Sequence, residues 1–169
     1  MLLVFDRISD VDTSSLKTVY LQSIKRMGDD FYRRFPEPER KFLAEERFID
    51  DLRDFFLITH GELFMLYVDG KPVSALRSET YLDGQLISYL ETSPDMRGRG
   101  YAGILISSVI KHLRGQGIDR IYSHINKKNL PSLAVHRTNG FQISADYAKL
   151  LDGTVSQNYF TLRYNSTAE

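Results

Sequence analysis

The sequence predicts a mixed α/β fold, in which a mostly antiparallel central sheet contains one parallel β-α-β crossover. Three observations lead to this prediction. Apolar residues recur at helical spacing in the first 60 residues, Asp-Gly pairs separate β-rich runs in the middle, and an amphipathic helix stands between two later strands. The expected order is β-α-α-β-β-β-α-β-α-β-β. The length of 169 residues predicts a single domain spanning residues 1–169.

The N-terminal third predicts one strand and two helices. A short strand is expected at Leu2–Phe5. The break at Arg34–Pro38 separates two stretches of helical periodicity, with Pro38 near the start of the second helix, where the first turn tolerates proline. The periodic apolar residues before the break are Leu16, Val19, Tyr20, Ile24 and Met27, and those after it are Phe42, Leu43, Phe48, Ile49, Leu52, Phe55 and Phe56.

The middle of the chain predicts a three-stranded antiparallel meander. The β-rich runs are Leu63–Val68, Val73–Tyr81 and Gln85–Thr92. Asp69-Gly70 and Asp83-Gly84 separate them, and an Asp-Gly pair favours a tight hairpin because such turns need positive φ.

The C-terminal part returns to alternating helices and strands. A helix from Ala102 closes at Gly115 and Gly117, and a strand follows at Ile118–Ile125. Because this helix joins two strands, it predicts a parallel crossover. The remaining expected elements are a helix at Asn129–Asn139 with Pro131 in its first turn, and strands at Phe141–Leu151 and Asn158–Tyr164 around Asp152-Gly153.

Composition excludes several classes of protein. The net charge is zero, which argues against a nucleic-acid binder, and no apolar run approaches the ~20 residues of a membrane span. There are no cysteines, and the chain starts without a signal-peptide pattern, so we expect a cytoplasmic protein. Charge is unevenly distributed: residues 97–137 carry eight basic residues and one acidic residue, whereas residues 29–54 carry a net charge of −3. This asymmetry suits a polyanionic cofactor and a cationic substrate, although solvated helix faces explain the acidic part equally well.

A glycine-rich loop joins the third meander strand to the following helix. Gly98 and Gly100 allow the backbone to approach a ligand, and the N–H groups at the helix start form an anion site that Arg97 and Arg99 strengthen. A purely structural turn is the alternative. A P-loop is excluded because Tyr101-Ala102 stands where it needs Lys-Ser/Thr.

A dinucleotide-binding fingerprint is excluded by its context. Gly98, Gly100 and Gly103 have the G-x-G-x-x-G spacing. However, three hairpin strands precede them, and no acidic residue ends the next strand to hold a ribose.

Two segments carry a resemblance to the GNAT superfamily of N-acetyltransferases. Arg97-x-x-Gly100-x-Ala102 is similar to the family signature Q/R-x-x-G-x-G/A, and Leu90–Pro94 resembles the strand and bulge that precede it. About 30 residues later, Asn129 to Gly140-Phe141 resembles a second family segment. The resemblance covers roughly Leu63–Tyr164 and implies a GNAT-like fold with acetyl-CoA as co-substrate.

The resemblance also implies roles for individual residues. The cofactor pyrophosphate would be held by the main-chain N–H groups of the loop, namely Arg97, Gly98, Arg99, Gly100, Tyr101 and Ala102. The backbone at Leu90 and Thr92 would run beside the pantetheine arm. Asn129 would hydrogen-bond that arm, or simply cap the helix, and Ser132 would lie near the sulfur.

Two catalytic residues are expected. Many family members place a tyrosine acid where this chain has His136, which shares a helix face with Asn129 and Ser132; we predict that His136 protonates the leaving thiolate. Glu91 is the expected general base. Secondary candidates are Glu79 and Tyr89 for the base, and Tyr147 and Tyr159 for the acid.

The predicted activity is transfer of an acetyl group to a primary amine of a small molecule or peptide by direct attack. Neither nucleic acid nor membrane is an expected partner, and a homodimer stays open as an assembly. Two alternatives stay open: a non-catalytic CoA-binding regulatory module, and a protein-interaction domain that uses the acidic helical pair.

Overall fold

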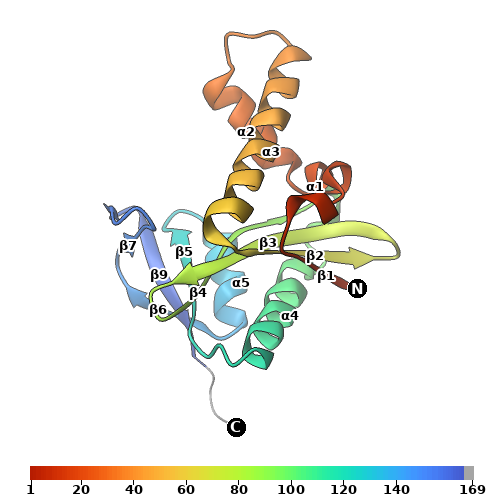
Figure 1. Cartoon of the computed structure of the whole chain (residues 1–169). Helices are drawn as coiled ribbons and strands as arrows, with labels where there is room; N and C mark the ends of the chain where they lie inside the picture. The colour runs from red at the N-terminus through yellow and green to blue at the C-terminus, as the bar shows by residue number, and fades with distance from the viewer. Residues whose placement is uncertain (166–169) are drawn as a thin grey trace.

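A seven-stranded sheet with the order β1-β2-β3-β4-β5-β9-β6 organises the computed structural model, which describes residues 1–165 (Figure 1). Among the described strands, β4 and β5 form the one parallel pair, as the crossover predicts. The strands are β1 (Leu2–Phe5), β2 (Glu62–Val68), β3 (Lys71–Tyr81), β4 (Gly84–Thr92), β5 (Ile121–Asn126), β6 (Phe141–Ala145) and β9 (Tyr159–Tyr164), and a separate hairpin contains β7 (Ala148–Lys149) and β8 (Val155–Ser156).

Within residues 1–165, five α-helices cover the two faces of the sheet. They are α1 (Thr13–Val19), α2 (Leu21–Phe31), α3 (Glu39–Thr59), α4 (Tyr101–Gly115) and α5 (Leu130–Thr138), with short 3₁₀ turns at Ile8–Asp10 and Pro94–Met96. The first three lie on one face and α4 and α5 on the other, while the α2–α3 pair projects beyond the sheet (Figure 1). The single helix expected before the proline break is divided at Tyr20, which leaves the helical region.

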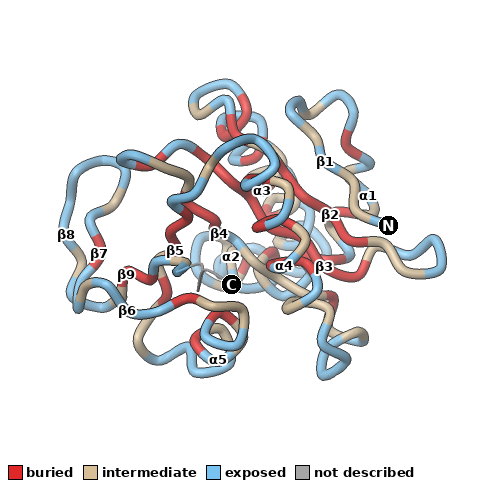
Figure 2. Tube along the Cα trace, turned by 90° about the horizontal axis from the view of Figure 1, so that it is seen from below, coloured by how far each residue is buried: buried red, intermediate tan, exposed pale blue. Residues whose placement is uncertain are grey.

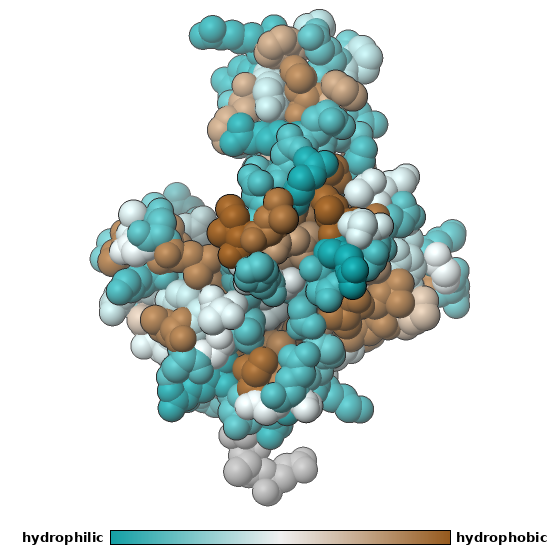
Figure 3. Space-filling model, in the orientation of Figure 1, coloured by the Kyte–Doolittle hydropathy of each residue, from teal (hydrophilic) through white to brown (hydrophobic). Residues whose placement is uncertain are grey.

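Two large buried clusters fill the layers, and a smaller one joins Tyr81, Leu86 and Tyr122; buried positions are red in Figure 2. One large cluster packs α4 and α5 against the sheet around Leu105, Ile106 and Phe141, and the other packs α1–α3 around Leu16, Leu52 and Met65. Burial of the periodic apolar faces is what stabilises these helices, since apolar surface contributes roughly 25 cal/mol per Å² removed from water. Apolar residues also remain exposed on and near the projecting helices (Figure 3), including Phe31, Phe42, Leu57 and Ile58.

The two meander turns differ in their use of Asp-Gly. Between β2 and β3, Asp69 and Gly70 have φ of 49° and 73°, as the tight turn requires. Between β3 and β4, the positive φ falls on Leu82 instead, and Gly84 is already part of β4. A Cβ at Gly84 would collide with the Arg120 carbonyl oxygen. Glycine at that position therefore permits the close approach of the chain preceding β5.

The C-terminal strands are shorter than expected. The run Phe141–Leu151 was expected as one strand, but β6 ends at Ala145 and the chain turns into the β7–β8 hairpin. Asp152 stabilises the hairpin turn by accepting hydrogen bonds from the N–H and hydroxyl of Thr154. Similarly, β5 begins at Ile121 rather than Ile118. Within residues 1–165, no helix combines the length and apolar character needed to cross a membrane.

Candidate active site

The parallel strands β4 and β5 separate after a short contact. They pair only at Gln85–Ile121, Leu86–Tyr122 and Ile87–Ser123. Just beyond, β4 contains a bulge against β3, where Tyr89 has a φ of 53°. The bulge and the divergence remove the backbone partners that β5 would otherwise offer to the end of β4.

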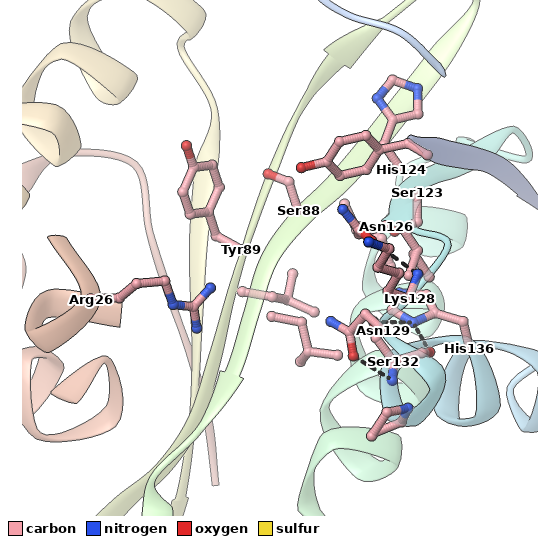
Figure 4. A pocket seen from close by; sticks show the side chains of 16 residues that line it. Arg26, Ser88, Tyr89, Ser123, His124, Asn126, Lys128, Asn129, Ser132 and His136 are labelled. Atoms are coloured by element: carbon pink, nitrogen blue, oxygen red, sulfur yellow. Dashed lines mark hydrogen bonds between the residues drawn. The ribbon is translucent and has the colours of Figure 1, made fainter. Parts of the chain in front are cut away.

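A cleft of about 620 Å³ opens at this divergence (Figure 4). Ile87–Leu90 of β4 and Ser123–Asn126 of β5 line it, together with Asn129 and neighbouring residues at the start of α5. Arg26 reaches it from α2 on the opposite side of β4 (Figure 4). The cleft is therefore bordered by elements from both faces of the sheet.

The glycine-rich loop leads from the end of β4 into α4. Gly98 and Gly100 have φ of 73° and 80°, and a Cβ built on either residue meets no atom within 4 Å. Gly100 is the N-cap of α4 and provides no side-chain cap. Across the described residues 1–165, the N–H groups of residues 97–103 donate to no protein acceptor. Free donors at a helix start with open space before them form an anion-binding site.

The two loop arginines have different surroundings. The guanidinium of Arg97 folds back to donate to the Thr92 carbonyl oxygen at 3.0 Å and to Gln22 at 2.6 Å. Arg97 therefore links the loop to α2. The sequence suggested that its side chain strengthens a phosphate site, but the guanidinium is already engaged by these two acceptors. Arg99 is exposed beside the open loop.

Glu91 lies outside the cleft lining. Its carboxylate accepts a hydrogen bond from Ser23 of α2, and its Oε1 lies 3.5 Å from Nη2 of Arg97. Only 10% of the side chain is exposed. This arrangement holds α2 against the end of β4, and it leaves Glu91 poorly placed for the general-base role predicted above.

Asn129 and Ser132 begin α5 at the edge of the cleft. The Oδ1 of Asn129 accepts a hydrogen bond from the Ser132 N–H at 3.2 Å, so Asn129 caps the helix. The capping alternative is therefore correct. Both residues line the cleft, as does Lys128.

His136 also lines the cleft, but it is only 2% exposed. Its Nδ1 lies 2.8 Å from the Ser132 carbonyl oxygen, and a carbonyl can only accept, so Nδ1 carries the proton. The ring packs edge-on against Phe141, and burial lowers the pKa of His136. The neutral ring thus has a lone pair, not a proton, at Nε2, which argues against the predicted acid role.

The secondary candidates for the general acid and base differ in whether they line the cleft. Tyr159 and Tyr89 line the cleft, whereas Tyr147 and Glu79 do not. Burial raises the pKa of Glu79, which lies on β3.

Residues 24–141 match the model of the Acetyltransferase (GNAT) family. The chain belongs to the GNAT family. GNAT acetyltransferases use acetyl-CoA as co-substrate, and the family prediction made from the two motifs is confirmed. A search of curated proteins gives no match.

Solved GNAT structures share the fold over the full chain at low sequence identity. The PaiA N-acetyltransferase from Thermoplasma acidophilum, in complex with coenzyme A, has a TM-score of 0.63 and 12% identity, covering 98% of this chain and 99% of that one. The ribosomal-protein-S18-alanine N-acetyltransferase from Escherichia coli has a TM-score of 0.60 and 15% identity, with coverage of 100% and 99%. An acetyltransferase from Bacillus subtilis in complex with CoA has a TM-score of 0.62 and 12% identity, with coverage of 98% and 99%.

The residues of this GNAT chain fit the co-substrate. The open loop at Gly98 and Gly100 offers unused N–H donors to a pyrophosphate, and the diverging strands leave backbone groups of β4 available to an extended amide-containing arm. In both cases the groups available to the co-substrate belong to the backbone and not to side chains.

Sequence reasoning missed several residues of the GNAT cleft. The sequence predicted no site role for four of the residues that line it, namely Arg26, Ser88, His124 and Lys128. Strand alternation over residues 121–126 would have placed Tyr122 and His124 on one face. For Arg26 the sequence contains no such signal, because its place depends on how α2 packs on the sheet.

Proposed function

We propose that this GNAT chain is an N-acetyltransferase that transfers acetyl from acetyl-CoA to a primary amine of a small-molecule or peptide acceptor. The proposal rests on one observation: β4 and β5 diverge after three pairs, and the cleft between them is bordered by residues from both faces of the sheet. Two substrates can approach such an opening from opposite sides. The amine then attacks the thioester directly, which requires both substrates to be bound together.

The cofactor site that we propose combines part of the cleft with the loop before α4, because Leu90, Asn129 and Ser132 line the cleft whereas Thr92 and residues 97–102 do not. In this proposal, the N–H groups from Arg97 to Ala102 hold the pyrophosphate, with Arg99 as the free cation. The backbone of Leu90 and Thr92 runs along the pantetheine. Because Oδ1 of Asn129 caps α5, only its Nδ2 is left to donate to that arm.

Tyr159 is the acid that we propose for the departing thiolate. It lines the cleft, and its phenolic hydroxyl can donate a hydrogen bond and a proton to the departing sulfur. His136 instead has its single proton engaged by the Ser132 carbonyl oxygen. We therefore expect Tyr159→Phe to lower kcat by about 10-fold to 100-fold and His136→Phe to lower it less.

The charge of the cleft bears on the acceptor. Arg26 and Lys128 line it, and no carboxylate lines it within residues 1–165. A polycationic acceptor is therefore disfavoured, and the cationic substrate suggested by the acidic stretch 29–54 is proposed here as an amine with a single ammonium group. Charges of that stretch are partly neutralised by neighbours, including the Arg40–Asp29, Arg40–Glu37 and Arg53–Asp50 ion pairs.

An amine panel tests the proposed function. Acetyl-CoA is incubated with the protein and single amines, including amino acids, peptides, aralkylamines and polyamines, and the release of free thiol is measured. We expect at least one primary amine to accelerate thiol release and to become acetylated by mass spectrometry. Acetyl-CoA binding by calorimetry without any turnover would instead support the CoA-binding module, and absence of binding would support the interaction domain.

A further inference from the structure

We propose that His124 is the general base that takes a proton from the acceptor ammonium group, with the Ser88 hydroxyl as a second contact to the nitrogen. This inference rests on the proposed N-acetyltransferase function. His124 directly follows Ser123, which forms the last pair between β5 and β4, so it stands where the strands begin to diverge. Both His124 and Ser88 line the cleft (Figure 4).

His124 faces the side of the sheet from which an acceptor can enter. Its neighbour Ile125 packs into the core under α4 and α5, so strand alternation turns His124 toward the α1–α3 side. Arg26 borders the cleft from that side, whereas Asn129 and Ser132 border it from the α5 side. With the cofactor arm beside α5, the amine approaches past Arg26 toward His124.

The hydrogen bonds of Tyr81 determine the tautomer of His124. The Tyr81 hydroxyl donates its only proton to the Lys149 carbonyl oxygen at 2.9 Å. The same oxygen lies 3.2 Å from Nε2 of His124, and it can therefore only accept. Nε2 thus carries the proton, and Nδ1 has a free lone pair. Within residues 1–165, Nδ1 of His124 has no hydrogen-bond partner.

The tautomer is the reverse of that in His136, where Nδ1 is the donor. Burial lowers the pKa of His124, which keeps the imidazole neutral and able to accept a proton at pH 7. Ser88 provides a second unsatisfied group, because its Oγ is buried and has no partner among the described residues. A buried hydroxyl of this kind is destabilising until a ligand or water pairs with it.

Within residues 1–165, no carboxylate lines the cleft to serve as an equivalent base. Glu91 is held by Ser23 and lies outside the cleft lining. The titratable or charged groups on the elements around His124 include Arg77, Glu79 and Tyr81 on β3, Tyr89 on β4, Tyr122 on β5, Tyr159 and Arg163 on β9, Tyr147 before β7, Arg26 on α2 and Lys128 before α5. Burial is what keeps His124 neutral among them.

The proposed reaction forms one C–N bond and breaks one C–S bond. Nδ1 of His124 takes one proton from the ammonium group, and the nitrogen lone pair forms the C–N bond to the thioester carbonyl carbon. The C–S bond breaks, and its electron pair leaves on sulfur. Of the two protons still on nitrogen, one passes to the sulfur through the Tyr159 hydroxyl and one stays in the amide. His124 finally releases its proton to solvent.

The first test measures rate against pH for His124→Gln, with an amine found active in the panel. We expect kcat/KM at pH 7 to fall about 100-fold or more, with unchanged acetyl-CoA affinity by calorimetry. In the variant, kcat/KM should keep rising toward the amine pKa of ~10, because only amine already deprotonated in solution can react. The matched control His112→Gln, on α4 outside the cleft, should keep the wild-type profile.

The second test does not depend on activity. Two-bond ¹⁵N–¹H NMR correlations should show His124 protonated at Nε2, and Tyr81→Phe should weaken that preference and lower kcat/KM. An active wild type with an unchanged His124→Gln profile, or a His124 protonated at Nδ1, would overturn the base role while leaving the N-acetyltransferase function intact. A wild type that acetylates no amine would overturn both.

Discussion

Single glycines in the loop before α4 hold backbone conformations that other residues resist. Gly100 has a φ of 80°, and its surroundings are open, so a larger side chain there would occupy space available to a ligand rather than clash with protein. The same is true of Gly153 in the β7–β8 turn, which has a φ of 84° and open surroundings but lies away from the cleft. A substitution at either position adds the same backbone strain, but a substitution at Gly100 alone of the two would also obstruct a ligand. Comparing them therefore distinguishes strain from loss of ligand contact.

We predict that Gly100→Val abolishes acetyl-CoA binding in calorimetry, whereas Gly153→Val leaves it unchanged. Each variant should lose about 1–3 kcal/mol of stability, because a β-branched residue at positive φ is strained. Both should retain the wild-type circular dichroism spectrum. Wild-type affinity in folded Gly100→Val would show that the phosphates bind elsewhere.

His136 also has a consequence for stability at the residue scale. Burial lowers its pKa in the folded state below the unfolded value of ~6.5, so the unfolded chain binds more protons between the two pKa values. The contribution of neutral His136 to the free energy of unfolding is then fully present above pH ~6.5, and it declines as the pH falls from the unfolded pKa toward the folded pKa. We predict this decline in urea unfolding at successive pH values, with a shallower slope in His136→Phe. His124, whose pKa burial also lowers, should account for part of the remaining slope.

At the scale of elements, the divergence of β4 from β5 depends on how closely the two strands begin. Gly84 starts β4 against the Arg120 carbonyl oxygen, and Gln85 donates its N–H to that same oxygen at 2.9 Å. The strands are thus held together at one end and separated at the other by the bulge at Tyr89. The cleft is the result of both features.

We predict that Gly84→Ala destabilises the protein by about 1–3 kcal/mol, because the added methyl group forces the two segments apart. Gly115→Ala is the matched control, since Gly115 ends α4 with nothing within 4 Å of its Cβ position, and it should change stability by less than about 1 kcal/mol. Urea denaturation measures both changes. Equal stabilities of the two variants would contradict the proposed close contact.

At the scale of the whole molecule, cofactor binding should stabilise the fold, because the loop, β4 and α5 come together only in the native state. We predict that acetyl-CoA at 100 times its dissociation constant stabilises the chain by about 2.7 kcal/mol. For a domain of this size, that corresponds to a rise in Tm of roughly 5–10 °C. Scanning calorimetry should show the shift in the wild type and lose it in Gly100→Val; a shift of equal size in both would contradict the loop assignment.

Local patterns in the chain were enough to predict the mixed sheet, the parallel crossover and the family. Helical periodicity, the Asp69-Gly70 turn and the Gly98–Gly100 loop each depend on a few neighbouring residues, and each forms where the sequence predicted it. Helical spacing also predicted that Asn129, Ser132 and His136 share one face of a helix, and all three line the cleft. Local patterns failed for the length of the strand after Phe141, because Asp152 and its turn draw the chain into a separate hairpin.

The chemical state of most site residues was decided by tertiary contacts, whereas the Nδ1 proton of His136 is oriented within its own helix. Arg97 and Glu91 look like free charges in the sequence, yet packing of α2 engages both. The proton of His136 is oriented by a carbonyl one turn earlier, and that of His124 by Tyr81, which is 43 residues away. Local periodicity specifies which residues form a strand or helix, whereas burial, tautomer and pairing depend on groups that only folding brings together.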